Sequence, residues 1–293
     1  MEQKKRRRGD RKDGYLVRDI DSMHALAPYM LPNRADNEAF LTETLDMTNV
    51  IKYIDNKNAD NPEFKYTFFH FLVAAIAKTI VLRPKMNRFY SGHRLYDRKD
   101  LLFSFVVKKQ FSDSGMEVLA TIKIDQDSDV PPIEQVYEKI KKIVFSVRKG
   151  DKQDSATDKM DILLKIPRPI LRFAIRVLRW LEYHGKYPKA LMCDDPYYSS
   201  VFLSNLGSIK MSADYHHLAN WGTNSIFGII GEMKPMPFYG EDGSVSVKKG
   251  LTLSMTIDER IADGFYFANS IKILRKLVEN PELIDEPINK PID

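Results

Sequence analysis

Two short stretches hold residues with the types and positions to handle a proton. Glu259 lies in DERIADG, which follows strictly alternating apolar residues from Leu251 to Ile257, and His216 and His217 are adjacent in SADYHHLANWGTN. A carboxylate or an imidazole can accept a proton in general base catalysis. Since neighbouring residues of an extended chain point in opposite directions, at most one of the two histidines faces a given site.

The patterns of several other enzyme classes are absent from the sequence. It contains no HExxH, P-loop, GxSxG or GxGxxG motif, so metalloprotease, phosphate-loop and α/β-hydrolase interpretations have no support. Cys193 is the single cysteine, and the acidic neighbours Asp194 and Asp195 disfavour its thiolate. One cysteine rules out a disulfide framework and a CxxC metal site. We therefore expect no metal and a cytoplasmic, reducing compartment.

The formal net charge of +5 is unevenly distributed. Residues 1–13 carry a net +4, residues 165–189 carry +6, and the remainder sums to −5. A nucleic-acid-binding protein usually has a basic face on its folded body, so we do not expect nucleic acid as a partner. Like charges repel and nothing in the N-terminus can pack, which predicts a disordered basic tail over residues 1–15.

The second basic segment has the spacing of an amphipathic helix. Arginines recur at i, i+4, i+8 and i+11 among apolar residues between positions 168 and 180: Arg168, Arg172, Arg176 and Arg179. Two interpretations stay open. The helix packs on the domain with its arginines in water, or Arg172, Arg176 and Arg179 reach the phosphates of an anionic membrane as a peripheral contact.

The elements around these residues are mixed. The pattern predicts a buried helix from Thr67 to Leu82, containing His70 and too interrupted to span a bilayer. Polar residues 150–160 predict a loop. Further strands are expected at 38–46, 87–97, 101–108, 116–124, 199–203, 225–233 and 251–257, and further helices at 47–55, 132–149 and 265–278. Without regular strand–helix alternation, this order predicts a layered α+β fold.

Several segments resemble one family in the same order. LTLSMTIDERIADGFYFANSIKILRKLVENPELI resembles the end of the catalytic domain of dihydrolipoyl acyltransferases of 2-oxo acid dehydrogenase complexes, and is similar to chloramphenicol acetyltransferase. Both carry H-x-x-x-D-G at this turn. PEFKYTFFHFLVAAIAKTIVLRPKMNRF, SSVFLSNLGSI and SIFGIIGEM resemble earlier segments, so the resemblance covers roughly 38–125 and 198–285.

The resemblance implies a chloramphenicol acetyltransferase-like fold, a two-layer α+β sandwich with a mixed sheet. It implies one domain over 16–293 that forms a homotrimer with active sites at subunit boundaries. The segment at about 145–197 is an insert relative to the family. The implied activity is transfer of an acyl group from a coenzyme A or lipoyl-type thioester, as co-substrate, to an unidentified small-molecule or thiol acceptor.

The family's site residues carry over to particular positions here. The resemblance implies that the Ser204 hydroxyl stabilises the tetrahedral oxyanion. It implies a structural turn made by Arg260, Asp263 and Gly264, in which Asp263 pairs with an arginine. Arg18 and Arg34 are both candidates for that arginine. The residues that would bind coenzyme A are not identified.

Glu259 departs from the family, because it stands where the base histidine is expected. Its ordinary pKa of about 4.3 lies about 4 units below that of a thiol, so proton transfer is uphill by roughly 5–6 kcal/mol, against under about 3 kcal/mol for histidine. Burial can raise a carboxyl pKa and close this gap. Three hypotheses remain: Glu259 is the base, His216 or His217 is the base, or the protein is a catalytically degenerate trimeric binding or scaffold module.

Overall fold

The alternating segment before DERIADG forms the longest strand. In the computed structural model, which describes residues 5–108, 117–148, 165–193 and 195–292, β10 (Val245–Asp258) lies inside a seven-stranded sheet. It pairs antiparallel with β2 (Glu38–Asp46) along one edge and with β8 (Ile226–Ile230) along the other. Leu251, Leu253 and Ile257 are fully buried, as the alternation predicts.

The sheet is mixed. Its order is β2-β10-β8-β7-β5-β6, with β9 (Lys234–Tyr239) added to the outer end of β10. The central strand β7 (Val201–Asn205) is parallel to both neighbours, β8 and β5 (Leu101–Lys108), whereas β6 (Glu117–Ile124) is antiparallel to β5. This arrangement confirms the predicted α+β class with a mixed sheet.

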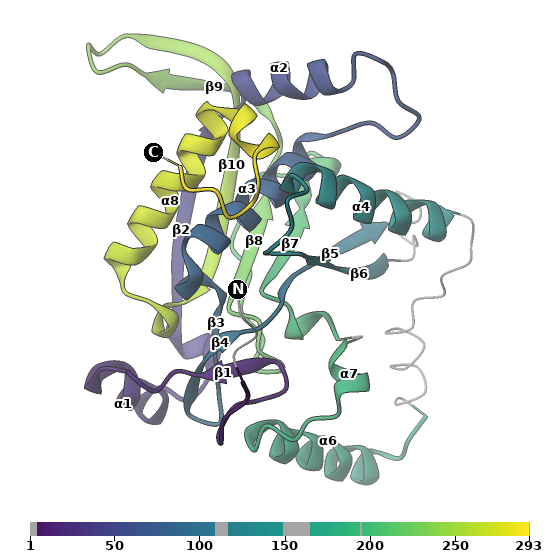
Figure 1. Cartoon of the computed structure of the whole chain (residues 1–293), viewed down its shortest axis with the longest axis vertical. Coiled ribbons are helices and arrows are strands. Elements are labelled where there is room, and N and C mark those ends of the chain that lie inside the picture. The colour runs from purple at the N-terminus through teal and green to yellow at the C-terminus, as the bar shows by residue number, and fades with distance from the viewer. Residues whose placement is uncertain (1–4, 109–116, 149–164, 194, 293) are drawn as a thin grey trace.

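Four helices cover one face of the sheet (Figure 1): α2 (Thr48–Lys57), α3 (Phe68–Leu82), α4 (Pro132–Arg148) and α8 (Gly264–Glu279). The most buried is α3, whose residues from His70 to Ile80 are all inaccessible, and it ends before Pro84 because proline cannot continue a helix. The main core lies between these helices and the sheet. A two-layer sandwich results, as predicted.

A smaller unit lies at one end of the main sheet (Figure 1). It consists of a three-stranded sheet with the order β1-β4-β3, the short helix α1, and the helices α6 and α7. Their bounds are β1 (Gly14–Leu16), α1 (Ser22–Met30), β3 (Arg88–Ser91), β4 (Arg94–Arg98), α6 (Arg168–Tyr183) and α7 (Lys189–Cys193).

Two strand predictions were wrong in detail. The segment 87–97 is a hairpin of β3 and β4, since Gly92 and His93 both have positive φ (56° and 60°) and reverse the chain. The sequence also concealed β9, because its exposed residues show no burial pattern and Pro235 and Pro237 argue against a strand. As an edge strand of a solvent-exposed hairpin, β9 tolerates both prolines.

The expected disordered tail is wrong for residues 5–15. Arg11 is 3% exposed and donates hydrogen bonds to Asp13, to Ser91 and to Glu182 of α6. Gly14–Leu16 then pairs with β4. The long-range partners of Arg11 lie far away in sequence, so local composition could not indicate them.

The insert expected at 145–197 contains α6 and α7 in its described part, while the loop predicted at 150–160 lies outside the described residues. No helix of the described chain is both long and apolar enough to cross a bilayer.

Candidate functional site

The turn that carries Glu259 is built on a buried charge cluster. Asp258 ends β10 with its side chain inaccessible, and both carboxylate oxygens accept hydrogen bonds from Arg260, from Nε and Nη2 at 2.8 Å. Arg34 Nε lies 3.7 Å from the same carboxylate. The arginines flank one carboxylate, so the cluster holds the short 3-10 turn Glu259–Ile261 in place.

Glu259 itself projects from this rigid turn into solvent. Its side chain is exposed within the single chain, although both neighbours, Asp258 and Arg260, are buried. A carboxylate acts as a base toward a thiol most readily where water is excluded, and the single chain leaves Glu259 in solvent. Any dry environment for Glu259 must therefore come from a substrate or from a second subunit.

Asp263 caps a helix and makes no arginine pair in the described chain. Its carboxylate accepts a hydrogen bond from the backbone N–H of Tyr266 at 2.8 Å, and this bond holds the pKa of Asp263 below its ordinary value. The proposed partners are engaged elsewhere: Arg18 binds Asp10 at 3.0 Å, and Arg34 lies beside Asp258. The expected Asp263–arginine pair is not formed within the described part of the single chain, where Arg34 and Arg260 lie beside Asp258.

Ser204 lies near the end of β7, on the face of the sheet away from the helices. Leu203 points into the main core, so Ser204 shares the opposite face with Phe202, whose ring belongs to a second, smaller cluster. The side chain is half-buried. The next turn is tight: a Cβ on Gly207 would lie 2.4 Å from the carbonyl oxygen of Gly231, so only glycine fits there.

The histidine pair lies in the loop that crosses this same sheet face. The ring of His216 stacks on Phe227 of β8, with centroids 4.2 Å apart and planes 8° from parallel. The parallel register aligns Phe202 with Phe227 and Ser204 with Ile229, so His216 and Ser204 are on one face about two residues apart along the strands. His217 stacks on His216, and both are exposed.

The strand register separates Ser204 from Glu259 within one chain. Ser204 is level with Ile229 of β8, and Ile229 is level with Ser254 of β10. Glu259 lies five residues further along β10 and two strand spacings to the side. At about 3.3 Å per residue and about 4.8 Å per spacing, the two residues are roughly 15 to 20 Å apart. They cannot act on one small substrate from the same chain.

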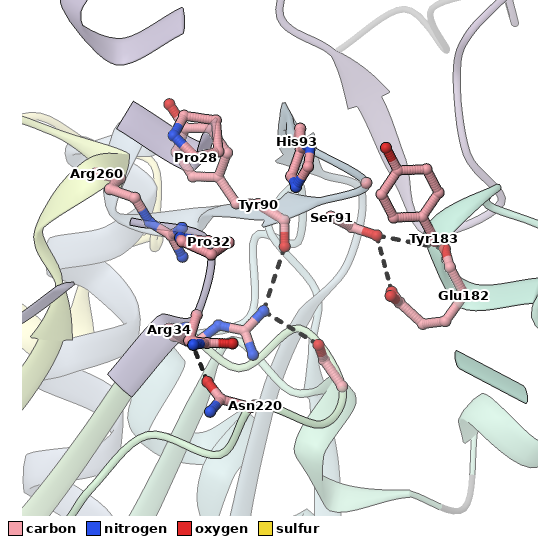
Figure 2. Close-up of a pocket in the computed structure, with 13 residues that line it drawn as sticks. Pro28, Pro32, Arg34, Tyr90, Ser91, His93, Glu182, Tyr183, Asn220 and Arg260 are labelled. Carbon is pink, nitrogen blue, oxygen red and sulfur yellow. Dashed lines mark hydrogen bonds between the residues drawn. The ribbon is translucent and has the colours of Figure 1, made fainter. Parts of the chain in front are cut away.

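A cavity of about 160 Å³ lies behind the Glu259 turn (Figure 2). Arg34, 6% exposed, donates from its guanidinium to the carbonyl oxygens of Tyr90 (3.2 Å), Ala219 (2.7 Å) and Gly222 (3.1 Å). Burial lowers the pKa of Arg34 while Asp258 opposes that change. Arg34 therefore ties the end of the histidine loop to the β3–β4 hairpin and to the Glu259 turn. Neither Ser204 nor Glu259 lines the cavity.

Sequence reasoning missed Asp258, and it offered Arg34 as a partner for Asp263, whereas Arg34 lies beside Asp258. The available signal was the position of Asp258, which breaks the run of hydroxyl residues Thr252, Ser254 and Thr256 on the same strand face. The partner Arg34 had no local signal, because it is 224 positions away. No group of three or more potential metal ligands occurs among the described residues.

Comparisons with known proteins agree with this architecture. Residues 189–285 match the family model described as 2-oxoacid dehydrogenases acyltransferase (catalytic domain). The probable dihydrolipoamide acetyltransferase of Listeria monocytogenes is similar in structure, with a TM-score of 0.57, 15% identity, and coverage of 92% of this chain and 95% of that one. The dihydrolipoamide acetyltransferase of Azotobacter vinelandii has a TM-score of 0.57 at 16% identity, covering 92% and 93%.

A chloramphenicol acetyltransferase is also similar, with a TM-score of 0.52 at 10% identity over 90% of this chain and 99% of that one. The chain has the chloramphenicol acetyltransferase-like fold. The predicted resemblance to the dehydrogenase acyltransferases is confirmed over 189–285, a stretch that contains Ser204, both histidines and the Glu259 turn.

Two curated proteins are also similar in sequence. The lipoamide acyltransferase component of the branched-chain alpha-keto acid dehydrogenase complex of Bacillus subtilis is 20% identical over 83% of this chain and 46% of the relative. Component 4 of the chloroplastic pyruvate dehydrogenase complex of Arabidopsis thaliana, a dihydrolipoyllysine-residue acetyltransferase, is 30% identical over 36% and 22%. The chain thus spans less than half the length of these two curated relatives.

Proposed function

We propose that the protein is an acyltransferase that moves an acyl group from a coenzyme A or lipoyl-type thioester to a small-molecule or thiol acceptor. The observation that carries this proposal is the match of residues 189–285 to the acyltransferase catalytic domain, because that stretch holds both chemical groups the reaction needs. We treat residues 16–293 as one catalytic domain with an insert at about 145–197.

The reaction balances with two side chains. The nucleophilic atom of the acceptor bonds to the thioester carbonyl carbon, and Glu259 accepts the proton that this atom loses. The Ser204 hydroxyl donates a hydrogen bond to the oxygen, which becomes negative in the tetrahedral intermediate. The carbon–sulfur bond then breaks, and the leaving thiolate recovers the proton from Glu259. The products are the acylated acceptor and free thiol.

The geometry supports a site shared between two chains of a homotrimer. Ser204 and Glu259 are too far apart in one chain, and Glu259 is exposed there. A neighbouring subunit that brings its own Ser204 sheet face against this turn would place the two groups on one substrate and exclude water. Exclusion of water from a carboxylate favours its protonated form, which a carboxylate base on a thiol needs.

The comparison with Azotobacter vinelandii dihydrolipoamide acetyltransferase supports the residue choice. The catalytic roles studied in that protein belong to a serine, a histidine and an asparagine four positions after the histidine. Glu259 and Asp263 have the same spacing here. The space beside Gly264 is open, because a Cβ there would meet nothing within 4 Å in the single chain, and this supports the approach of a substrate to the turn.

His216 is the second candidate for the base, with His217 as its neighbour. It is favoured by one observation, its position on the Ser204 face of the sheet. An imidazole is in general a stronger base than a carboxylate. We place the protein in the cytoplasm, where its single exposed cysteine, Cys193, stays reduced.

The test is thiol release from a panel of acyl-coenzyme A donors with small thiol and hydroxyl acceptors. We expect release well above background, with kcat about 10²–10⁴-fold lower in Glu259→Gln. Glu259→His should retain activity and move the acidic limb of the pH profile toward pH 6.5, because activity falls as the base becomes protonated.

His216→Ala and His217→Ala are the matched controls, and both should retain activity. If His216→Ala abolishes turnover while Glu259→Gln does not, the base is His216. If no donor releases thiol and calorimetry detects no coenzyme A binding, the acyltransferase proposal is wrong and the degenerate binding or scaffold module replaces it.

A further inference from the structure

The helix α6 lies at the outer edge of the molecule and is fixed mainly at its C-terminal end (Figure 1). Arg11 donates a hydrogen bond to the carbonyl oxygen of Glu182 at 2.8 Å and another to its carboxylate at 3.1 Å, while Ser91 donates to the same carboxylate at 2.9 Å. No residue of α6 is buried. The helix is thus held firmly while most of its surface remains accessible.

Three faces run along α6. One is half-buried against the protein and consists of Leu171, Ala174, Ile175, Leu178 and Leu181. The second is apolar yet exposed: Ile170 (58%), Phe173 (69%), Val177 (39%) and Trp180 (56%). The third consists of Arg168, Arg172, Arg176 and Arg179, all exposed. At 3.6 residues per turn, the three faces are about a third of a turn apart.

Helix α6 has more apolar residues than a surface helix needs for packing on one face. The burial of the helix falls on the half-buried face, whereas the second stripe, at spacing i, i+3, i+7 and i+10, stays exposed along its whole length. Contiguous exposed apolar surface of this kind marks an interaction site.

The exposed face continues beyond α6 through a series of ring contacts. Trp180 contacts His184 with centroids 4.6 Å apart, and Tyr183 contacts His93 at 5.5 Å. His93 in turn contacts Tyr29 of α1 at 4.6 Å. The exposed residues of α1 then extend the apolar surface: Met23, Leu26, Tyr29 and Met30. Both helices lie at the same end of the long axis (Figure 1).

The charges beside this surface identify the partner. Residues 165–189 carry a net +6, and the exposed arginines lie to the side of the apolar face rather than opposite it. A helix lying in a bilayer interface needs this geometry, because its apolar side chains enter the acyl boundary while its arginines reach sideways to lipid phosphates. Tryptophan also favours the interfacial depth.

We propose that α6, with the adjoining exposed residues of α1, docks the protein on an anionic membrane surface. Ile170, Phe173, Val177 and Trp180 enter the interface, and Arg172, Arg176 and Arg179 bind lipid phosphates. The arginines alone could bind any polyanion. The exposed apolar stripe adds to the binding free energy only if the partner also has an apolar layer, as a lipid bilayer has. The docking leaves the proposed acyl-transfer residues untouched, so the two proposals succeed or fail separately.

Vesicle co-sedimentation of the full-length protein tests this docking. Vesicles of phosphatidylcholine with about 30% phosphatidylserine should bind the wild type, and phosphatidylcholine alone should bind it at least tenfold more weakly. Phe173→Ser/Trp180→Ser should lower partitioning at least tenfold, and so should Arg172→Glu/Arg176→Glu/Arg179→Glu. Raising the salt to 0.5 M should weaken binding, because screening acts on the arginine contribution.

Matched controls change equally exposed residues elsewhere. Tyr239→Ser/Val247→Ser removes apolar side chains that are 77% and 72% exposed, and Lys234→Glu/Lys249→Glu/Lys272→Glu reverses the same number of charges. Both should bind vesicles like the wild type. In a Trp221→Phe background, the emission of Trp180 should shift to the blue with anionic vesicles.

Wild type that stays in the supernatant with anionic vesicles overturns the proposal, and so does equal loss of binding in the control variants. If sedimentation velocity shows that Phe173→Ser/Trp180→Ser reduces the oligomer size without changing vesicle binding, the face joins copies of this chain instead. If the charge reversal abolishes binding but the apolar variant does not, the site is a simple polyanion contact.

Discussion

At the residue scale, Asp258 explains why the turn after β10 keeps its shape without an arginine partner for Asp263. The carboxylate is inaccessible, and Arg260 and Arg34 would both be buried cations without it. Removing one partner of a buried ion pair leaves an uncompensated charge, which costs far more than the pair itself contributes.

We therefore predict that Asp258→Asn lowers the free energy of unfolding by about 3–5 kcal/mol. Urea denaturation at pH 7 measures the loss. Glu286→Gln is the control, because its pair with Lys290 is solvent-exposed and its loss should leave stability nearly unchanged. Equal stability of the two variants would show that the Asp258 cluster does not hold the turn.

The buried side chain of His70 makes folding stability depend on pH. It is 3% exposed, and burial lowers its pKa to about 4. In the unfolded chain this histidine has an ordinary pKa of about 6.5, so between pH 6.5 and 4 it binds a proton in the unfolded chain but not in the folded chain. Folding stability is therefore highest above pH 6.5 and falls as the pH drops toward 4, by about 3 kcal/mol in total.

The variant His70→Gln should lose this pH dependence but keep the helix cap. His70 Nδ1 accepts the backbone N–H of Thr67 at 3.0 Å, and glutamine makes the same contact in a capping box. Unfolding free energies at pH 7 and pH 4.5 should differ by about 2 kcal/mol more in wild type than in the variant. Parallel losses in the two proteins would assign the acid sensitivity elsewhere.

At the scale of elements, two glycines next to the candidate site have opposite surroundings. Gly207 follows β7, and its backbone approaches Gly231 so closely that a Cβ would lie 2.4 Å from a carbonyl oxygen. Gly264 begins α8, and a Cβ there would meet nothing within 4 Å. The first glycine is needed for packing in the single chain, and the second is not.

We predict that Gly207→Ala lowers the free energy of unfolding by roughly 1–3 kcal/mol, while Gly264→Ala leaves it unchanged or raises it by up to about 1 kcal/mol, since alanine favours a helix. Thermal unfolding followed by circular dichroism distinguishes them. Under the proposed function, Gly264→Ala should still lower acyl transfer, because the new methyl group faces the incoming substrate. Full activity in Gly264→Ala would place the substrate elsewhere.

The elements that sequence patterns predicted are those whose burial is local and regular. The alternation from Leu251 to Ile257 and the apolar run of α3 each indicate their own structure, and both are present. The hairpin strand β9 was missed because its exposed prolines carry no pattern. In α6 the sequence showed the arginine stripe. Apolar residues cover most of the rest of the helix surface, so their spacing could not predict which of them pack and which stay exposed.

Sequence motifs named candidate site residues but could not give the distances between them. The motifs pointed to Ser204 and the Glu259 turn, which the family match also contains. Their separation along β7, β8 and β10 depends on strand register, and the pairing of Arg34 with Asp258 joins distant parts of the chain. Such long-range relations depend on the whole fold, so the spacing of residues within one segment cannot predict them.

At the scale of the whole molecule, a site divided between chains has a quantitative consequence. Under the proposed function, each boundary of a cyclic trimer takes Ser204 from one chain and Glu259 from the next. Homotrimers of Ser204→Ala or of Glu259→Gln therefore have three defective sites. A trimer that contains both kinds of chain has one boundary at which both contributed residues are native, whichever kind is in the majority.

Mixing the two inactive variants should therefore restore activity. With random assembly at a 1:1 ratio, three quarters of the trimers are mixed and each has one working site of three, so about one quarter of the wild-type activity should return. Co-expression with two different affinity tags, followed by tandem purification, isolates the mixed trimers, whose activity should approach about one third. If purified mixed trimers remain at background, the two residues do not share a site, and the proton acceptor has to be sought on the Ser204 face, where His216 already lies.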